Sequence, residues 1–269
     1  RPQALIAFEG WSDACDAASG GATYLLGQFD SEPFAILDPE EFLDFQANRP
    51  TVEIDDGGTR ALKWPTTRIY GLTLEGERDL VVVLGPEPNV RWKTFARMLA
   101  HIFSSVGVER VVTLGAFVGQ VPHTMPVPIV GVATDPALVS KHDLLGSRYE
   151  GPTGIISAVL EACREEGIET VSLWAATPHY LAANANPKAM AALLEKAGEV
   201  LGVRFDTSEL DRVAAEFMAR VDAATKSSAD LTAMVRKLEE ALAESGGGSL
   251  EQVDPSEMVR EIEEFLKDR

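Results

Sequence analysis

The fold of this chain is decided by ALIAF at residues 4–8, followed at once by EGWSDACD at residues 9–16. The five apolar residues are typical of a strand that is buried on both faces of a sheet. The second stretch places a glycine and several polar side chains where a helix, predicted over Asp13–Gln28, begins. In open α/β sheets, such turns from strand to helix are where binding sites are built. The sequence therefore predicts an α/β fold and a candidate site at this turn.

The same succession of strand and helix continues along most of the chain. Apolar runs rich in β-branched residues alternate with helical segments, which indicates a three-layer α/β sandwich with a mostly parallel central sheet. The other predicted strands are Phe34–Leu37, Asp79–Leu84, Arg110–Leu114, Pro128–Ala133 and Thr170–Ala175. The other predicted helices of this part are Arg91–Val106, Gly154–Glu166 and Pro187–Leu201.

One segment interrupts this succession. Between residues 51 and 75 the pattern becomes short and alternating, around the turn sequence Asp55–Gly58. Such a turn between short alternating runs is typical of a β-hairpin. We therefore predict an antiparallel excursion, with Arg60–Trp64 and Arg68–Leu74 as strands.

The C-terminal part of the chain is predicted to be helical. Ser208–Ala243 reads as helix, and its second half has the apolar spacing of a helix that packs against another helix. A Gly/Ser break at residues 245–249 precedes a last amphipathic helix over Pro255–Leu266. We predict an α/β core domain over residues 1–205 and a helical extension over residues 206–269, which packs either on its own subunit or on a neighbour.

The composition limits the class of partner. The 269 residues are 45% hydrophobic and 25% charged, as in an ordinary globular protein. The 24 basic and 42 acidic residues give a formal net charge of -18, which opposes binding to nucleic acid and to acidic membranes because both present negative charge. No apolar stretch is long enough to span a bilayer and no leader is recognised, so we expect a cytoplasmic protein.

Signatures of common catalytic chemistry are missing from the sequence. There is no nucleophile elbow, phosphate-binding loop, dinucleotide fingerprint or HExxH zinc motif. The two cysteines, Cys15 and Cys163, have no Cys or His at metal-ligand spacing, and we expect both to be reduced thiols. We therefore expect no cofactor and no metal, and an enzyme is the less favoured alternative.

The turn after the first strand carries the first candidate residues. Glu9 and Asp13 flank Trp11, and their acidic side chains would suit a hydroxylated, cationic or metal-bearing ligand better than a phosphate. Capping of the following helix by Ser12 or Asp13 is the simpler interpretation. Cys15 lies in the first helical turn and is either a nucleophile or a small packed residue.

Three further candidates follow along the chain, and the last of them consists of two segments, one with Thr153 and one with His179 and Tyr180. Glu87 and Arg91 follow a predicted strand and either orient a ligand or pair with each other. His123 follows a glycine-containing strand exit and is a candidate acid or base. Thr153 is predicted to cap the next helix. The last predicted strand is followed by His179 and Tyr180.

All four turns are expected to meet at one edge of a parallel sheet. Their side chains would then form either a small-molecule pocket or a protein-facing surface with aromatic anchors. We call this set of candidate residues the rim. It comprises Glu9, Trp11, Asp13, Glu87, Arg91, His123, Thr153, His179 and Tyr180.

Four segments carry a resemblance to a known family. They are Gly10–Ala14, Gly85–Pro88, Leu114–Ala116 and Pro152–Gly154, in this order and at this spacing. The ordered set resembles the proteasome assembly chaperone family as it occurs in bacteria and archaea. The resemblance implies a phosphorylase/hydrolase-like fold and a homo-oligomer, with a trimer favoured.

The resemblance also implies a function. It predicts a protein-binding factor whose candidate partners are proteasome subunits. Some members dock through a terminal hydrophobic-Tyr-X signal, whereas this chain ends in Leu266–Arg269, so docking by that route is not expected. The alternative is a hydrolase or transferase acting on a nucleoside-like ligand, with His123 or Glu9 as acid or base and Cys15 as a candidate nucleophile.

Overall fold

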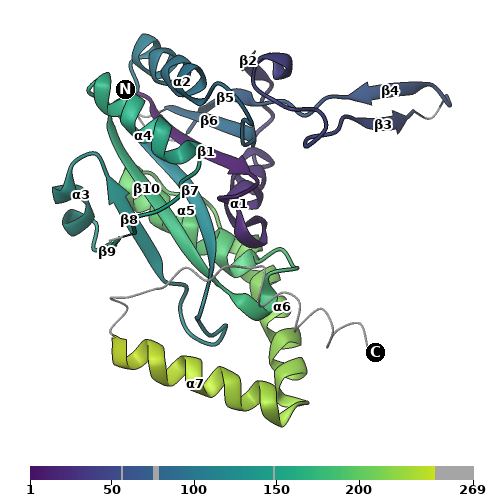
Figure 1. The fold of residues 1–269 in the computed structure, drawn as a ribbon, viewed down its shortest axis with the longest axis vertical. Coiled ribbons are helices and arrows are strands. Elements are labelled where there is room, and N and C mark those ends of the chain that lie inside the picture. The colour runs from purple at the N-terminus through teal and green to yellow at the C-terminus, as the bar shows by residue number, and fades with distance from the viewer. Residues whose placement is uncertain (56, 75–78, 148, 246–269) are drawn as a thin grey trace.

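The centre of the protein is an eight-stranded sheet (Figure 1). The computed structural model defines residues 1–55, 57–74, 79–147 and 149–245. The strands are β1 (Gln3–Glu9), β2 (Pro33–Ile36), β5 (Arg68–Thr73), β6 (Asp79–Pro86), β7 (Arg110–Gly119), β8 (Ile129–Ala133), β9 (Leu145–Gly146) and β10 (Glu169–Pro178). Their spatial order is β2-β5-β6-β1-β7-β10-β8-β9. The central strands β6, β1, β7 and β10 run parallel, whereas β5 and β8 run antiparallel to their central neighbours.

Helices cover both faces of the sheet. α1 (Ala17–Leu26) and α5 (Pro187–Leu201) pack on one face, and α2 (Trp92–Val106) and α4 (Ile155–Glu165) pack on the other. A short helix, α3 (Pro136–Lys141), follows β8. Within the described residues, no helix has both the length and the apolar character needed to cross a membrane. The predicted fold class is therefore confirmed as a mostly parallel central sheet between helical layers.

The central strand β1 shows why residues 4–8 determine this arrangement. Successive side chains of a strand point to opposite faces of the sheet. Leu5 and Ala7 belong to the core under α1 and α5, while Ile6 and Phe8 belong to the core under α2 and α4. All four side chains are fully buried. One apolar run thus contributes to both cores.

The strand β7 is longer than the sequence pattern predicted. It continues to Gly119, beyond the predicted end at Leu114. Gly115 lies inside the strand and packs against its neighbour, and it does not form a turn. The ring of Trp174 on β10 lies so close that an added Cβ at Gly115 would be 2.7 Å from it. The small residue is needed for this close approach within the sheet.

The segment between β2 and β5 forms a separate two-stranded sheet. β3 (Thr51–Ile54) and β4 (Arg60–Lys63) pair antiparallel across the predicted turn, where Gly58 N–H donates to Asp55 O. Both strands predicted in this region are present. They belong to different sheets, however, because β5 pairs with β2 and β6 in the main sheet.

Two helices follow α5 where the sequence pattern predicted one. The prediction of a continuous helix over Ser208–Ala243 is wrong, because α6 (Ser208–Lys226) and α7 (Ala229–Ser245) are separated at Ser227 and Ser228. The Ser227 hydroxyl donates to a backbone carbonyl at the end of α6, and the Ser228 hydroxyl accepts from a backbone N–H at the start of α7. Serines satisfy backbone groups in this way at helix ends more readily than inside a helix.

The helical extension folds back on its own subunit. Val221 of α6 and Leu238 of α7 pack with Tyr180 and Leu181, which belong to a 3-10 turn after β10. Within the described residues, the extension therefore packs against the end of the sheet. The predicted Gly/Ser break beyond Ser245 and the predicted helix over Pro255–Leu266 lie outside the described residues.

Candidate functional site

The parallel strands end at one edge of the sheet, and the rim residues lie along this edge. Glu9 ends β1, Pro86 ends β6, Gly119 ends β7 and Pro178 ends β10. The rim residues follow these ends or lie on the segments packed beside them. Several of them form two clusters, one around Trp11 and one around His123, whereas Asp13, Arg91 and Thr153 have other partners.

The Trp11 cluster consists of Glu9, Trp11, Glu87 and Gly154. The backbone N–H of Glu87 donates to the carbonyl of Glu9 at 2.9 Å. An added Cβ at Gly154 would lie 2.7 Å from Glu87 Oε1 and 3.2 Å from the ring of Trp11. The turns after β1 and β6 therefore meet the start of α4, and glycine provides the space for this contact.

Glu87 binds the N-terminus of α4 with its own carboxylate. Glu87 Oε1 accepts a hydrogen bond from Ile155 N–H at 2.8 Å, where the helix begins. Free N–H groups and the helix dipole make a helix N-terminus favourable for an anion. Here the carboxylate of Glu87 takes the place that a ligand phosphate would need. Beside it, the Trp11 side chain is 50% exposed.

Arg91 and Thr153 have different partners from those predicted. Arg91 pairs with the carboxylate of Glu41 and lies over the ring of Phe42, so the predicted alternative of a pair with Glu87 is wrong. Thr153 does not cap α4, because Gly154 occupies the N-cap position and the Thr153 hydroxyl bonds to the hydroxyl of Ser157. The acceptor at this helix start is instead Glu87, which directly follows β6.

The turn after β1 is tightly constrained. The predicted helix over Asp13–Gln28 begins later, because a 3-10 turn over Ala14–Asp16 precedes α1. Cys15 and Asp16 both have left-handed backbone conformations, with φ of 58° and 49°. Such strain in two successive non-glycine residues persists only where surrounding contacts fix the chain. One such contact is the bond from Ala116 N–H to the carbonyl of Ser12, at 2.8 Å.

Asp13 is the main cap of α1. Its Oδ1 accepts from the backbone N–H groups of Ala18 at 2.7 Å and of Ser19 at 3.0 Å. Burial raises the pKa of Asp13 despite these bonds. The capping interpretation therefore describes this residue, which is buried and not presented to solvent.

The Cys15 thiol lacks the features of a nucleophile. It is buried and donates to the carbonyl of Leu181 at 3.6 Å. Burial raises the pKa of Cys15, which favours the unreactive thiol, whereas catalytic cysteines have lowered pKa values. The sulfur is a packing and bonding link between the turn after β1 and the turn after β10.

Glu9→Gln is expected to raise the melting temperature at pH 7. Partial burial raises the pKa of Glu9 above its ordinary value of 4.5, and the carboxylates of Asp13 and Asp16 raise it further. A carboxyl group whose pKa is higher in the folded chain than in the unfolded chain opposes folding once it is ionised. This cost is complete above the folded-state pKa and disappears as the pH falls below the unfolded-state value.

Thermal unfolding of wild type, Glu9→Gln and Glu9→Asp between about pH 4 and about pH 8 tests this prediction. The melting temperature of the glutamine variant should exceed that of wild type at neutral pH, and this difference should disappear as the pH falls. The aspartate variant keeps the charge and serves as the control. A gain that is independent of pH would contradict the electrostatic explanation.

The His123 cluster joins the sheet edge to the helical extension. His123 Nδ1 lies 2.7 Å from the Tyr180 hydroxyl, which also accepts from the backbone N–H of His123 at 2.7 Å. His123 Nε2 lies 2.9 Å from Asp222 Oδ1 on α6. Burial raises the pKa of Tyr180 to about 12, so the hydroxyl keeps its proton at neutral pH and can donate it to His123. Both ring nitrogens are therefore engaged.

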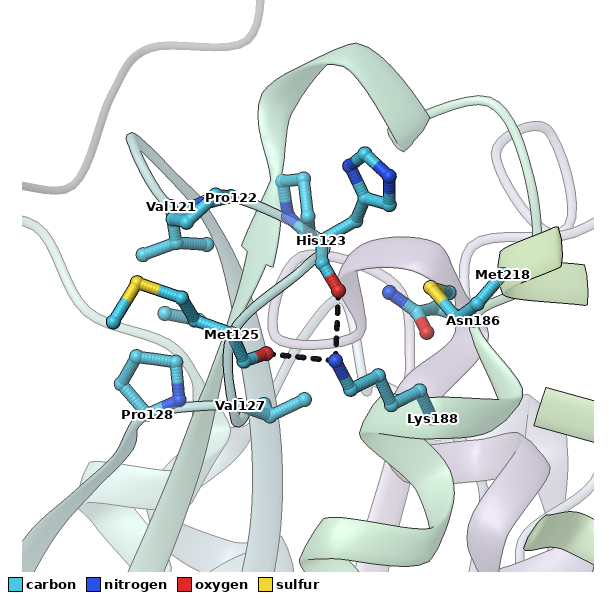
Figure 2. Close-up of a pocket in the computed structure, with 11 residues that line it drawn as sticks. Val121, Pro122, His123, Met125, Val127, Pro128, Asn186, Lys188 and Met218 are labelled. Atoms are coloured by element: carbon cyan, nitrogen blue, oxygen red, sulfur yellow. Dashed lines mark hydrogen bonds between the residues drawn. The ribbon is translucent and has the colours of Figure 1, made fainter. Parts of the chain in front are cut away.

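Lys188 holds the loop that carries His123. Its Nζ donates to the carbonyls of His123 and Met125, each at 2.7 Å. Burial lowers the pKa of Lys188. Figure 2 shows the His123 carbonyl turned towards Lys188 while the imidazole ring points away from it. The two basic side chains of this cluster thus fix backbone and helix positions.

A small pocket lies between the His123 loop and α5 (Figure 2). Its empty volume, open solvent included, is about 220 Å³. The lining residues are Val121, Pro122, His123, Met125, Val127, Pro128, Ala176, Pro178, Asn186, Lys188 and Met218. The lining is mostly apolar, and His123, Asn186 and Lys188 are its polar members.

His179 lies beside the His123 cluster. Its ring packs edge-on against Tyr180, with 5.2 Å between ring centroids. Burial lowers the pKa of His179, which keeps the imidazole neutral at pH 7. Among the described residues, its buried Nδ1 has no hydrogen-bond partner.

Asp222 and Lys188 were missed by the sequence analysis. Asp222 is 99 positions from His123, and Lys188 is 65 positions from it. No local pattern marks either residue, because each is a charged residue on an amphipathic helix. A signal for Asp222 would have required knowing that α6 returns to the sheet edge.

The chemical capacity of this edge is limited. His123 and Glu9 lie in different clusters, and hydrogen bonds hold the His123 ring between Tyr180 and Asp222. In the part of the chain that the structure describes, no group of three His, Cys, Asp or Glu side chains is placed to hold a metal ion. What the edge presents to solvent is an aromatic side chain among acidic groups. This is a surface suited to contact with another macromolecule.

The chain is similar to known proteins in both sequence and structure. The sequence profile of the PAC2 family matches residues 7–225. A PAC2 family protein from Streptomyces avermitilis is 45% identical, with a TM-score of 0.81 over 87% of this chain and 100% of that chain. A proteasome-assembly chaperone homologue from Mycobacterium tuberculosis is 38% identical, with a TM-score of 0.80 over 86% of this chain and 99% of that chain.

Structures with much lower sequence identity share the fold. An archaeal proteasome activator from Pyrococcus furiosus has a TM-score of 0.61 at 18% identity, over 83% of this chain and 95% of that chain. At this identity the similarity concerns the fold alone. No curated protein matches the sequence.

Proposed function

This chain belongs to the PAC2 family, and from this we propose that it is a protein-binding factor with a role like that of a proteasome-assembly chaperone. It acts in the cytoplasm as a homo-oligomer, with a trimer favoured, and proteasome subunits are its candidate partners. The observation that carries the proposal is the half-exposed Trp11 beside a helix start that Glu87 already fills.

The Trp11 cluster supports protein binding better than ligand binding. Tryptophan contributes a large contact area and is enriched at the energetic centres of protein interfaces. Because Glu87 takes the anion position of α4, the neighbouring surface offers a partner an aromatic side chain beside a carboxylate that is held by a hydrogen bond. A rigid surface loses little conformational entropy when a partner binds.

The charge of the chain favours one class of partner surface. With a net charge of -18, the protein is attracted to basic or mixed surfaces and repelled by acidic ones. Complementary charge mainly increases the rate and the specificity of association. We therefore expect binding to be stronger at low ionic strength.

The two proposed parts of the chain have different tasks. The α/β core domain, residues 1–205, carries the binding edge. The helical extension, from residue 206, supports that edge through the bond between Asp222 and His123 and through the apolar cluster around Tyr180. The His123 cluster is then a structural link and not a catalytic group.

A hydrolase or transferase receives less support. Such an enzyme needs an acid or base that can reach a bound substrate. The His123 ring is held on both sides, and burial raises the pKa of the Cys15 thiol. Glu9 remains, but the charged groups that raise its pKa are the carboxylates of Asp13 and Asp16, and Asp13 is already engaged in capping α1.

Binding to purified proteasome core particles from Mycobacterium tuberculosis tests the proposal. The immobilised chain is expected to bind them at about 50 mM salt and several-fold more weakly at about 300 mM salt, since screening weakens the attraction. An unrelated protein of similar acidic charge is the control. Absence of binding to core particles, half-particles and free subunits at the lower salt concentration would overturn the proposal.

A further inference from the structure

The two-stranded sheet of β3 and β4 projects from the body of the protein (Figure 1). We call it the arm. All eight residues of its two strands are exposed. A two-stranded hairpin is marginally stable in water unless it packs against something. The arm therefore needs a surface that its own subunit does not provide.

The two faces of the arm differ in chemistry. Val52 pairs with Leu62, and Ile54 pairs with Arg60, so these four side chains lie on one face. Val52, Ile54 and Leu62 are 55%, 62% and 56% exposed. The opposite face carries Thr51, Glu53, Ala61 and Lys63, and Glu53 pairs with Lys63 at 2.9 Å. Both faces are exposed, but only the apolar face gains free energy when another surface covers it.

Apolar exposure continues at the base of the arm. Phe34 and Ile36 of β2 are 54% and 59% exposed, and Trp64 follows β4 with 41% exposed. β2 is the edge strand of the main sheet, hydrogen-bonded only to β5 within the described chain. Half of the large apolar side chains that are exposed among the described residues lie between residues 33 and 64. Patches of this kind mark interaction sites.

The charge on the apolar face indicates which surface covers it. Arg60 is the charged residue of that face, and among the described residues it has no ion-pair partner. The rest of the chain is strongly acidic, with a net charge of -18. The net charge opposes self-association at long range, but at the contact itself Arg60 can pair with carboxylates, which this chain carries in excess, while the three apolar side chains are covered.

We propose that the arm binds a second copy of this chain, with the apolar face covered by the neighbouring copy and Arg60 directed at its carboxylates. A second copy is present wherever the protein is, and can cover the arm at all times. The inference specifies the contact that forms the homo-oligomer of the proposed function. It does not depend on the identity of the external partner.

The molar mass in solution tests this proposal. Wild type is expected to elute as an oligomer of the 29.0 kDa chain in size-exclusion chromatography with light scattering. The double variant Val52→Thr, Leu62→Thr keeps residues that favour strands but removes apolar surface, and should dissociate at concentrations about tenfold higher than wild type. Arg60→Glu should also dissociate, more strongly at low salt. The control variant Glu53→Gln, Lys63→Gln changes the opposite face and should keep the wild-type mass.

The outcomes separate the arm from the proposed partner. A monomeric wild type, or apolar-face variants that keep the wild-type mass, would overturn the role of the arm in self-association. Loss of binding to proteasome core particles with an unchanged oligomer would also overturn it, because the arm would then contact the external partner. An oligomer that depends on the arm but does not bind core particles would support the arm and count against the proposed function. Circular dichroism and unchanged melting temperatures of the subunit verify folding of each variant.

Discussion

Asp13→Ala is expected to lower the free energy of unfolding by about 2–4 kcal/mol, because two buried backbone N–H groups lose their acceptor. Asp13 Oδ1 accepts from Ala18 and Ser19, at 2.7 Å and 3.0 Å. Ala18 is fully buried, so water cannot replace the carboxylate. For a chain of this size the melting temperature should fall by roughly 5–15 °C.

Thermal and urea unfolding of wild type and three variants, Asp13→Ala, Asp13→Asn and Asp13→Ser, measure this effect. Asp13→Asn keeps a side-chain oxygen at the same position and should recover most of the loss. Asp13→Ser, a common helix cap, has a shorter side chain and is expected to fall between the two. An alanine variant as stable as wild type would mean that the cap contributes nothing to stability.

Trp11→Ala is expected to weaken binding to proteasome core particles by roughly 30-fold or more, which corresponds to about 2 kcal/mol. Removal of the indole takes away the large exposed aromatic side chain of the Trp11 cluster. The side chain is half exposed, so its loss should change the melting temperature little in comparison. Trp11→Phe keeps an aromatic ring and should retain much of the affinity.

A matched control for Trp11 exists on another part of the surface. Val106 lies at the C-terminal end of α2 and is 44% exposed. Val106→Ala removes exposed apolar area away from the strand ends and should bind core particles as wild type does. Equal affinities of wild type and Trp11→Ala, measured at the same low salt, would rule out the Trp11 cluster as the binding surface.

The fold was predictable from the sequence where the signal is local. A strand that is buried on both faces has a continuous apolar sequence, as at residues 4–8. The alternation of such strands with helices along the chain indicates the parallel sheet. The end of β7 was not predictable, because Gly115 looks like a turn residue. Only the position of Trp174 on the neighbouring strand shows why a glycine is required there.

The sequence indicates which residues lie at the candidate site, but it does not indicate which partners their side chains contact. Each rim residue follows a strand or begins a helix, which the sequence indicates. Arg91 binds Glu41, and His123 binds Asp222, across long stretches of chain. These partners depend on how the excursion after β2 and the helix α6 return to the sheet, and no local spacing encodes that path.

The break between α6 and α7 has a similar explanation. The apolar spacing continues through Ser227 and Ser228, so periodicity alone predicts one helix. Two helices form because serine hydroxyls bond to the two helix ends and because apolar residues are buried when α7 turns back. A straight helix would leave Val235 and Leu238 in water.

The place of the arm in the chain has a consequence for how this architecture can diversify. The polypeptide leaves the sheet after β2 and returns in β5, and these two strands are hydrogen-bonded neighbours. The exposed strands β3 and β4 belong to neither hydrophobic layer, so the arm can lengthen, shorten or change sequence, whereas Leu37 and Phe42, which precede it, belong to the core. If the arm joins subunits and the strand ends bind the partner, as proposed, subunit geometry can be altered in one module while recognition is inherited intact.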